Sequence, residues 1–244
     1  MDEKTPVTEK VVAVNGNMIT VEYTRRVMQN EVAFVRVGDS RLKSEVIRIR
    51  GKYADLQVFE STNKMKVGDE VEFTGELLSV ELGPGLLKQV YDGLQNPLNL
   101  LAEKAGFFLQ RGVYLSALDR VALWDFTPLA EAGQTVRAGD RLGSVPEGII
   151  THYIMVPFSW RGSWRVKSVA APGSYNIDTV IAELENDRGE LRKATMTQFW
   201  PVKIAISDHR SANMTKESLI KLASDARVAG LLSGKPGIVH LLTG

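Results

Sequence analysis

Phosphate binding is the first chemistry that the residue types suggest, because glycine and lysine stand side by side at 51–52 and 234–235. A nucleotide-binding P-loop needs Gly-x4-Gly-Lys-Ser/Thr, in which backbone amides and the lysine hold phosphates and the hydroxyl binds Mg²⁺. Here the two pairs are followed by Tyr53 and Pro236. The run Gly83-Pro84-Gly85 has no lysine and is typical of a rigid turn. The sequence therefore predicts no binding of ATP or magnesium by this chain.

Nucleophilic and metal chemistry have few candidate residues. The chain has no cysteine and three histidines, His152, His209 and His240. The adjacent pair Asp208 and His209 resembles a catalytic dyad only in composition, because neighbours in sequence seldom face each other. A binuclear zinc site would need several more histidine and aspartate ligands. We expect no catalytic, cofactor-binding or metal-binding residue.

Composition sets further bounds. The 244 residues suit one large domain or two small ones, with 44% hydrophobic and 24% charged residues. The formal net charge is +1, which gives no field to attract nucleic acid or anionic lipid. The first residues lack a signal-peptide pattern, and no apolar run reaches the ~18 residues of a membrane span. We expect a cytoplasmic protein that binds no nucleic acid and inserts into no membrane.

The first seventy residues predict a small β-barrel. Short apolar runs separated by turn signals indicate strands at 11–14, 18–23, 31–37, 45–50, 54–59 and 70–73. Asn15-Gly16 suits the positive φ angles of a tight hairpin turn, and further turns are expected at Gly38, Gly51 and Gly68. About six strands at this spacing favour a closed barrel, which leaves no exposed edge.

Helices are predicted after the Gly-Pro-Gly turn. Apolar residues recur near the 3.6-residue period from Leu86 to Leu94, and Pro97 suits the start of a second helix over 98–104 that Gly106 ends.

A second β-rich unit is predicted from about residue 113 to 196. The run 133–143, with glycines at both ends, predicts a tight hairpin that turns at Gly139-Asp140 in a compact barrel-sandwich domain. Its tip, 138–140, has no lysine, so a lipoyl-type carrier domain is not indicated. Over 176–184 the pattern predicts one amphipathic helix with Asn176 as its N-cap.

The pattern changes after Lys203. We expect a polar loop at 207–211, a helix over 215–229 and a buried-type strand at 238–242. The fold class predicted for the whole chain is thus mainly β: a small N-terminal barrel (1–76), a linker with short helices (77–112), a barrel-sandwich-like domain (113–200) and a short α/β tail (201–244).

The region from about 7 to 203 resembles the catalytic A subunit of A/V-type rotary ATPases. The most informative run is SVELGPGLLKQVYDGLQNPL at 79–98, which looks like the family's linker after its N-terminal barrel. Further matching runs lie at 27–32, 57–62, 67–71, 73–75, 111–112, 124–128, 154–158 and 200–203. The region 113–196 is similar to an extra domain that the family carries before its nucleotide-binding core.

The resemblance implies an assembly role. Members of the family couple ATP hydrolysis or synthesis to proton or sodium transport, and their A subunits alternate with B subunits in a ring. The matched part implies contacts with B subunits and with peripheral-stalk subunits, at a membrane reached through the complex. The family uses ATP and Mg²⁺, but its P-loop lies downstream of the matched part, so we expect this chain to be truncated before the core and inactive alone.

The last forty residues resemble a different family, the zinc-dependent isoaspartyl dipeptidases. The matching runs are 202–211 and 226–237. In that family the lysine at the position of Lys203 is carbamylated and bridges two metals, and the arginine at the position of Arg210 binds substrate. Leu242 stands where a histidine ligand is expected. Lys203 and Arg210 are therefore interpreted as vestiges. The alternative function is a dipeptidase fragment, inactive alone, in a chain made chimeric by recombination or by faulty sequence assembly.

Overall fold

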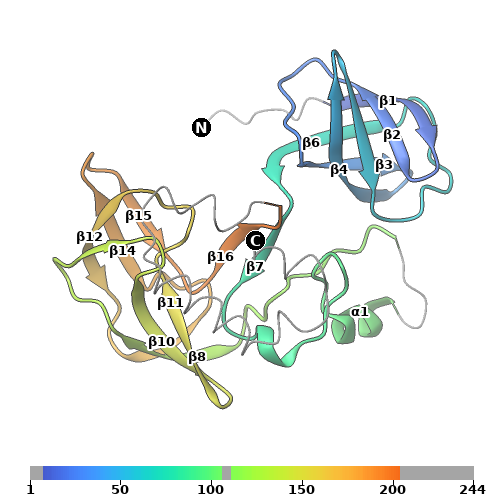
Figure 1. Ribbon diagram of the computed structural model, residues 1–244. Coiled ribbons are helices and arrows are strands. Elements are labelled where there is room, and N and C mark those ends of the chain that lie inside the picture. Colours follow the sequence, from blue (N-terminus) through green and yellow to red (C-terminus); the bar gives the residue numbers. More distant parts are fainter. Residues whose placement is uncertain (1–7, 106–110, 204–244) are drawn as a thin grey trace. The chain divides into compact units, whose positions relative to one another are not determined.

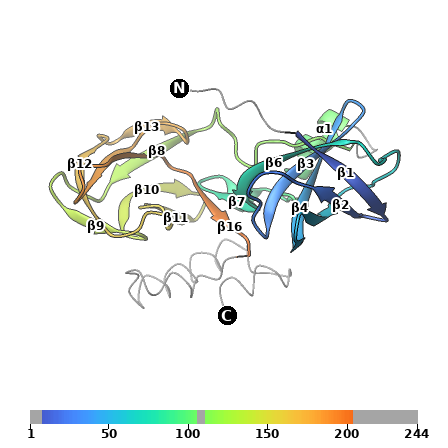
Figure 2. The same cartoon turned by 90° about the horizontal axis from the view of Figure 1, so that it is seen from above.

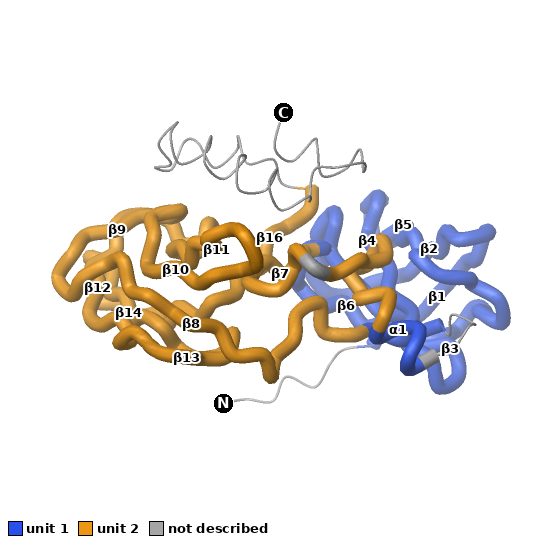
Figure 3. The backbone as a smooth tube through the Cα atoms, turned by 90° about the horizontal axis from the view of Figure 1, so that it is seen from below, with its two compact units in different colours: residues 1–78, 100–114 blue, residues 79–99, 115–244 orange. Residues whose placement is uncertain are grey.

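The structure is a computed structural model that describes residues 8–105 and 111–203 (Figure 1). It confirms the expected mainly β fold. Two compact units are present: Met1–Leu78 with Leu100–Tyr114, and Ser79–Asn99 with Leu115–Gly244 (Figure 3). Each unit has its own hydrophobic core. The loop, helix and strand expected after Lys203 lie outside the described residues.

The first unit (Figure 2) is a closed six-stranded antiparallel barrel. Its strand order is β1-β2-β5-β4-β3-β6. Its strands are β1 Thr8–Asn15, β2 Met18–Glu22, β3 Glu31–Val37, β4 Ser40–Arg50, β5 Tyr53–Val58 and β6 Glu70–Leu77. Alternate residues of these strands point inward, as the period of two requires, and form one apolar core. The barrel predicted from the sequence is confirmed.

The turns of the barrel fall where glycines allow a positive φ. Asn15 pairs with Met18 across the predicted hairpin, with Gly16 at φ 60°. Several strand boundaries were predicted wrongly. Strand β1 begins at Thr8 and not at 11, and β6 ends at Leu77 and not at 73. Strand β4 begins at Ser40 and not at 45, because it pairs with β3 directly from the turn at Gly38.

The end of unit 1 returns to the barrel through a short segment, 111–114. The Tyr114 hydroxyl donates to Glu60 Oε2 at 2.6 Å and accepts from the Lys43 amide at 2.6 Å. Burial is the main reason why the pKa of Tyr114 is raised, and the bond to Glu60 adds to it. Arg111 Nη1 donates to the backbone oxygens of Ser61 and Asn63.

The linker differs from the prediction. It contains strand β7 Ser79–Leu82, a 3₁₀ turn η1 Leu86–Lys88 and helix α1 Leu98–Ala105. Helix α1 confirms the second predicted helix, but the helix expected to continue to Leu94 ends at Lys88. The Asp92 side chain accepts the amides of Leu94 and Asn96, which offers the backbone a turn in place of a helix.

The second unit packs two four-stranded antiparallel sheets, β11-β10-β8-β13 and β15-β14-β12-β9, around one core. Strands β7 and β16 pair as a separate two-stranded ribbon. The strands are β8 Leu123–Pro128, β9 Thr135–Arg137, β10 Arg141–Glu147, β11 Ile150–Met155, β12 Ser163–Val169, β13 Gly173–Asn176, β14 Ala182–Asn186, β15 Leu191–Ala194 and β16 Gln198–Pro201.

The hairpin predicted over 133–143 is wrong. The chain does turn at Gly139, with φ 85°, but β9 pairs with β12 in one sheet and β10 pairs with β8 and β11 in the other. The Gly139 amide donates to Val156 and the Gly133 amide donates to Val166, so each end of the run is bound to a different part of the unit.

The helix predicted over 176–184 is also wrong. Asn176 ends β13, and its side-chain oxygen accepts the Asp178 amide and the Thr179 hydroxyl, so the residue expected to cap a helix builds a turn instead. Ile177 and Ile181 on either side of that turn are fully buried. These two residues are apolar because they enter the core from the ends of a turn, and not because they lie on one face of a helix.

Candidate functional site

The residues expected to be vestigial do not form a site in the described part of the chain. Lys203 is its last residue and is exposed. Arg210 lies outside it, as do Asp208, His209 and Leu242. Within 8–105 and 111–203, no group of three or more His, Cys, Asp or Glu side chains is placed to hold a metal ion.

The backbone at the Gly-Pro-Gly turn binds a carboxylate of the same chain, that of Glu147. Amides of Gly85 and Leu87 donate to Glu147 Oε1, at 2.7 and 3.2 Å. The second carboxylate oxygen lies 2.8 Å from His152 Nδ1. Glu147 ends β10, and its side chain is 1% exposed. These amides are therefore already hydrogen-bonded to a carboxylate, whereas a phosphate-binding loop uses such amides to bind its ligand.

The charge of Glu147 is stabilised by this arrangement. Burial by itself raises the pKa of the carboxyl. Hydrogen bonds from His152 and from the amides of Leu87 and Gly85 outweigh burial, and the pKa is lowered from its ordinary value of 4.5. Since the carboxylate ties the linker to the β10–β11 hairpin, its ionisation is coupled to the folding of unit 2.

We predict that Glu147→Gln destabilises unit 2 by about 2 kcal/mol at neutral pH, the scale of hydrogen bonds to a charged group. A carboxylate whose pKa is lower in the folded state stabilises the fold above its unfolded pKa, and this is lost as pH falls through the folded pKa. The difference from the parent chain should therefore shrink below pH 4.5. Urea unfolding followed by tryptophan fluorescence from pH 7 to 3 measures it.

Glu183→Gln is the matched control, because the Glu183 side chain is 43% exposed and its lysine partner is 3.8 Å away. We expect this change to cost no more than about 0.5 kcal/mol at any pH. A difference between the parent chain and Glu147→Gln that stayed constant from pH 7 to 3 would contradict the assigned role of the charge.

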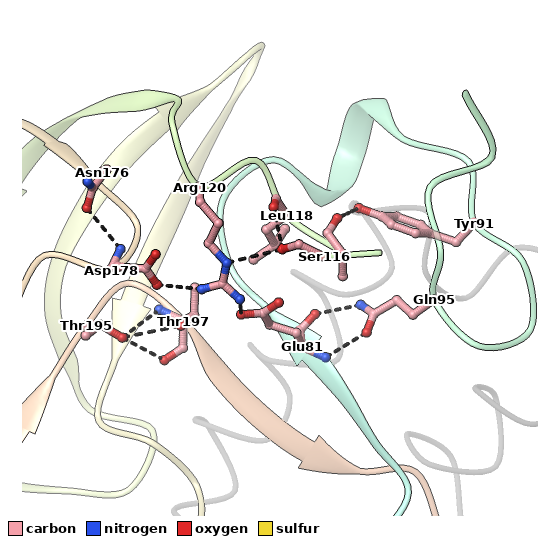
Figure 4. A network of polar contacts seen from close by, with 11 residues as sticks. Glu81, Tyr91, Gln95, Ser116, Leu118, Arg120, Asn176, Asp178, Thr195 and Thr197 are labelled. Carbon is pink, nitrogen blue, oxygen red and sulfur yellow. Dashed lines mark hydrogen bonds and ion pairs between the residues drawn. The ribbon is translucent and has the colours of Figure 1, made fainter. Parts of the chain in front are cut away.

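A second polar network joins the linker to the barrel-sandwich domain (Figure 4). Arg120 lies at its centre, between β7 and the β13–β14 turn, and contacts the carboxylates of Glu81 and Asp178. Its Nη1 is 2.5 Å from Asp178 Oδ1, and its Nε donates to Ser116 Oγ at 3.2 Å. The guanidinium thus connects three segments that are far apart in sequence.

Glu81 is the buried member of this network, with a side chain 6% exposed. Burial raises the pKa of its carboxyl, while Arg120 acts in the opposite direction. The Gln95 side chain binds both the amide and the carbonyl of Glu81, at 2.7 Å each. Nearby, the Tyr91 hydroxyl donates to Ala117 O at 2.7 Å. Burial, with the charges of Glu147 and Glu81, raises the pKa of Tyr91 to about 12, so this donor stays protonated.

None of these charged residues was predicted from the sequence to belong to a site. Glu81 stands between Val80 and Leu82 in β7, and that interruption of an apolar run was the available signal. Glu147 ends β10 between Pro146 and Gly148 and gave no such signal. A buried carboxylate implies a partner, but the partners Arg120 and His152 are separated from them by 39 and 5 residues. The polar groups of these networks bind one another, so their role is to hold the segments that carry them in place.

No described helix has the length and apolar character needed to cross a membrane.

Comparison with known proteins identifies the two units. Residues 11–75 match the β-barrel domain of the ATP synthase alpha/beta family. Residues 115–203 match the barrel-sandwich domain of the ATP synthase alpha/beta subunit. Over 211 residues, the chain is 56% identical to the V-type ATP synthase alpha chain of Treponema denticola, which covers 86% of this chain and 36% of the relative.

Two further relatives agree. The V-type ATP synthase alpha chain of Borrelia duttonii is 51% identical over 211 residues, with coverage of 86% and 37%. The V-type ATP synthase alpha chain 1 of Treponema pallidum is 56% identical over 193 residues, with coverage of 79% and 33%. The chain therefore spans about a third of the length of these relatives. Residues 11–75 and 115–203 therefore belong to the ATP synthase alpha/beta family, and this part of the chain corresponds to the N-terminal region of V-type alpha chains.

Proposed function

We propose that this chain is the N-terminal assembly portion of a V-type ATP synthase alpha chain. The observation that carries the proposal is the succession of the family's barrel and barrel-sandwich domains, in a chain 56% identical to an alpha chain over 211 residues. In the full complex its role is ATP-coupled transport of protons or sodium ions. Its partners are B subunits and peripheral-stalk subunits, and it works at the cytoplasmic face of a membrane, peripheral to the bilayer.

The polar chemistry of the described residues supports a structural role. The buried carboxylates Glu81 and Glu147 are bound by amides and side chains of the same unit. We assign assembly to the barrel, within 1–76, and stalk contact to the domain within 113–200, with the linker 77–112 between them.

Association with a B subunit tests the proposal. The full chain and the B subunit that accompanies the Treponema denticola alpha chain are mixed and analysed by native mass spectrometry. We expect a complex that the full-length Treponema denticola alpha chain displaces. The proposal is overturned if a chain whose circular dichroism shows β structure does not associate with the B subunit at about 100 μM. A Kd of that value corresponds to a binding free energy of about −5.5 kcal/mol.

We predict that the isolated chain neither binds Mg-ATP with a Kd below about 100 μM nor hydrolyses it. The P-loop lysine and hydroxyl that stabilise phosphoryl transfer have no counterpart in the sequence. In the structure, the amides of Gly85 and Leu87 are bound to Glu147. Isothermal titration calorimetry measures binding, and the Treponema denticola alpha and B subunits together serve as the positive control. Saturable heat from this chain alone would reveal a site of another kind.

The finer identity of the tail is also a proposal. We assign residues from about 202 to 244 to an isoaspartyl dipeptidase sequence joined to the alpha-chain region. The runs at 202–211 and 226–237, which resemble that family, are the observation behind this assignment. One sequencing read of the source DNA across codons 190–220 tests it, and continuous alpha-chain sequence through the junction would refute it. We expect no cleavage of β-aspartyl dipeptides with added zinc and bicarbonate, because Leu242 stands where a ligand is required.

A further inference from the structure

The barrel-sandwich domain is attached through a ribbon made of its own entry and exit strands. Strand β7 leads into unit 2, and β16 is the last strand of the described chain. They pair antiparallel, with Glu81 opposite Phe199 and Val80 opposite Trp200. Because isolated two-stranded ribbons are only marginally stable in water, this ribbon needs contacts with the rest of the unit to hold its position.

Close packing supplies one of these contacts. A Cβ atom at Gly83 would lie 2.9 Å from Leu118 Cδ1 and 3.2 Å from Met196 O. On β16, the Trp200 ring lies edge-on to Phe158, with centroids 5.1 Å apart. The ribbon therefore rests against the loop before β8 and the segment before β16.

The Arg120 network supplies a second, polar contact. One end of the guanidinium binds the buried Glu81 carboxylate in the ribbon. The other end binds Asp178, which stands in a turn next to the fully buried Ile177. Arg120 consequently links the ribbon to a turn that is anchored in the core of the barrel-sandwich domain (Figure 4).

We infer that Arg120 is a positioning residue that makes the β7–β16 ribbon and the barrel-sandwich domain move as one body. A displacement of the domain then carries the ribbon with it. This inference rests on the proposed function, because a load on the domain requires the assembled complex. When the Arg120 bridge is broken, the ribbon becomes a hinge while the two sheets of the domain keep their structure.

Hydrogen exchange of the full chain, measured by mass spectrometry, tests the inference without any partner subunit. In Arg120→Ala we expect amides of 79–82 and 198–200 to exchange about 10-fold faster or more, while those of β12 and β14 are unchanged. Arg120→Lys should recover part of the protection, because an ammonium keeps the charge but lacks the planar fork that reaches two carboxylates. Arg165→Ala, at an exposed position of β12, is the matched control and should leave the ribbon unchanged.

Three outcomes overturn the inference: unchanged ribbon exchange in Arg120→Ala, an equal loss of protection in β12 and β14, or a response to Arg165→Ala as large as that to Arg120→Ala. If Arg120→Ala does not fold, Asp178→Asn decides, since that carboxylate is 53% exposed and its change cuts only one end of the bridge. Faster ribbon exchange in Asp178→Asn then supports the inference, and unchanged exchange refutes it. Association with the B subunit is measured in a separate experiment. The exchange result can therefore be interpreted even if the chain does not bind the B subunit.

Discussion

Replacing Gly143 with alanine should destabilise the barrel-sandwich unit by about 3 kcal/mol, at the upper end of the usual cost of overpacking a core. A Cβ atom at this position would lie 2.1 Å from Phe126 Cε2 and 2.8 Å from Thr127 O. The Phe126 ring is 1% exposed and packs edge-on against Tyr175, so it has little room to move. Even if the ring rotated away, the Cβ atom would still lie too close to the Thr127 carbonyl oxygen. Gly143 pairs with Pro128 and with Ile154 on either side, which holds its own backbone in place.

Urea unfolding followed by tryptophan fluorescence measures this effect in the correct unit. All four tryptophans of the chain, Trp124, Trp160, Trp164 and Trp200, lie in unit 2. Gly93→Ala is the matched control, because Gly93 is in the same unit and a Cβ there meets no atom within 4 Å. We expect that control to change the free energy of unfolding by less than about 0.5 kcal/mol. If the two variants unfolded at the same urea concentration, the packing of Phe126 against Gly143 would be refuted.

Gly143 also shows what the sequence could and could not predict. Glycines at 133, 139 and 143 correctly marked places where the backbone is special. A turn at Gly139 was predicted and is present. Its flanking strands were assigned to one hairpin, yet they belong to different sheets. Gly143 is required by an aromatic ring 17 residues earlier in the chain, and a contact of that kind leaves no local pattern.

The barrel was predicted well because its information is local. Hairpin turns with Asn15-Gly16 or Gly38 follow strands that alternate between buried and exposed residues, and closure removes the edges. The helix expected from Asn176 failed for the opposite reason. Ile177, Ile181 and Leu184 have helical spacing, but each is fully buried in a turn or strand of a two-sheet core. Tertiary packing there decides between a cap and a turn, since asparagine serves both.

The candidate site was the least predictable part. Its members are titratable residues drawn from the linker, the loop before β8, the β10–β11 hairpin and the β13–β14 turn. A sequence shows each of them as an ordinary surface charge. Only the fold reveals that Glu81 and Glu147 are buried and that their partners are already provided. The lack of a lysine in the Gly-Pro-Gly turn predicts that it binds no nucleotide, but it does not reveal that the Gly85 amide is bound by the Glu147 carboxylate.

Replacing Glu31 with alanine should destabilise the barrel by about 3 kcal/mol, the usual cost of removing one member of a buried ion pair. Glu31 is fully buried, and its Oε1 lies 2.5 Å from Arg25 Nη2. The same carboxylate accepts the amides of Gly75 at 2.7 Å and Met28 at 2.8 Å. The register of β3 with β6 shifts just after Glu31, so the carboxylate satisfies an amide beside an irregularity in the strand pairing. Its loss would leave Arg25 without its carboxylate and two amides without an acceptor.

A matched control in the same barrel separates burial from charge. Arg41 and Glu72 form an ion pair of 2.8 Å, but their side chains are 49% and 35% exposed. Glu72→Ala should therefore cost less than about 1 kcal/mol. Since the barrel contains no tryptophan, hydrogen exchange of β3 and β4 peptides in increasing urea measures both variants. Equal losses of protection in the two variants would mean that burial of the Glu31 carboxylate adds nothing to the stability of the barrel. A large loss for Glu31→Ala alone would show that the carboxylate holds the loop before β3 and the β6 irregularity together from inside the barrel.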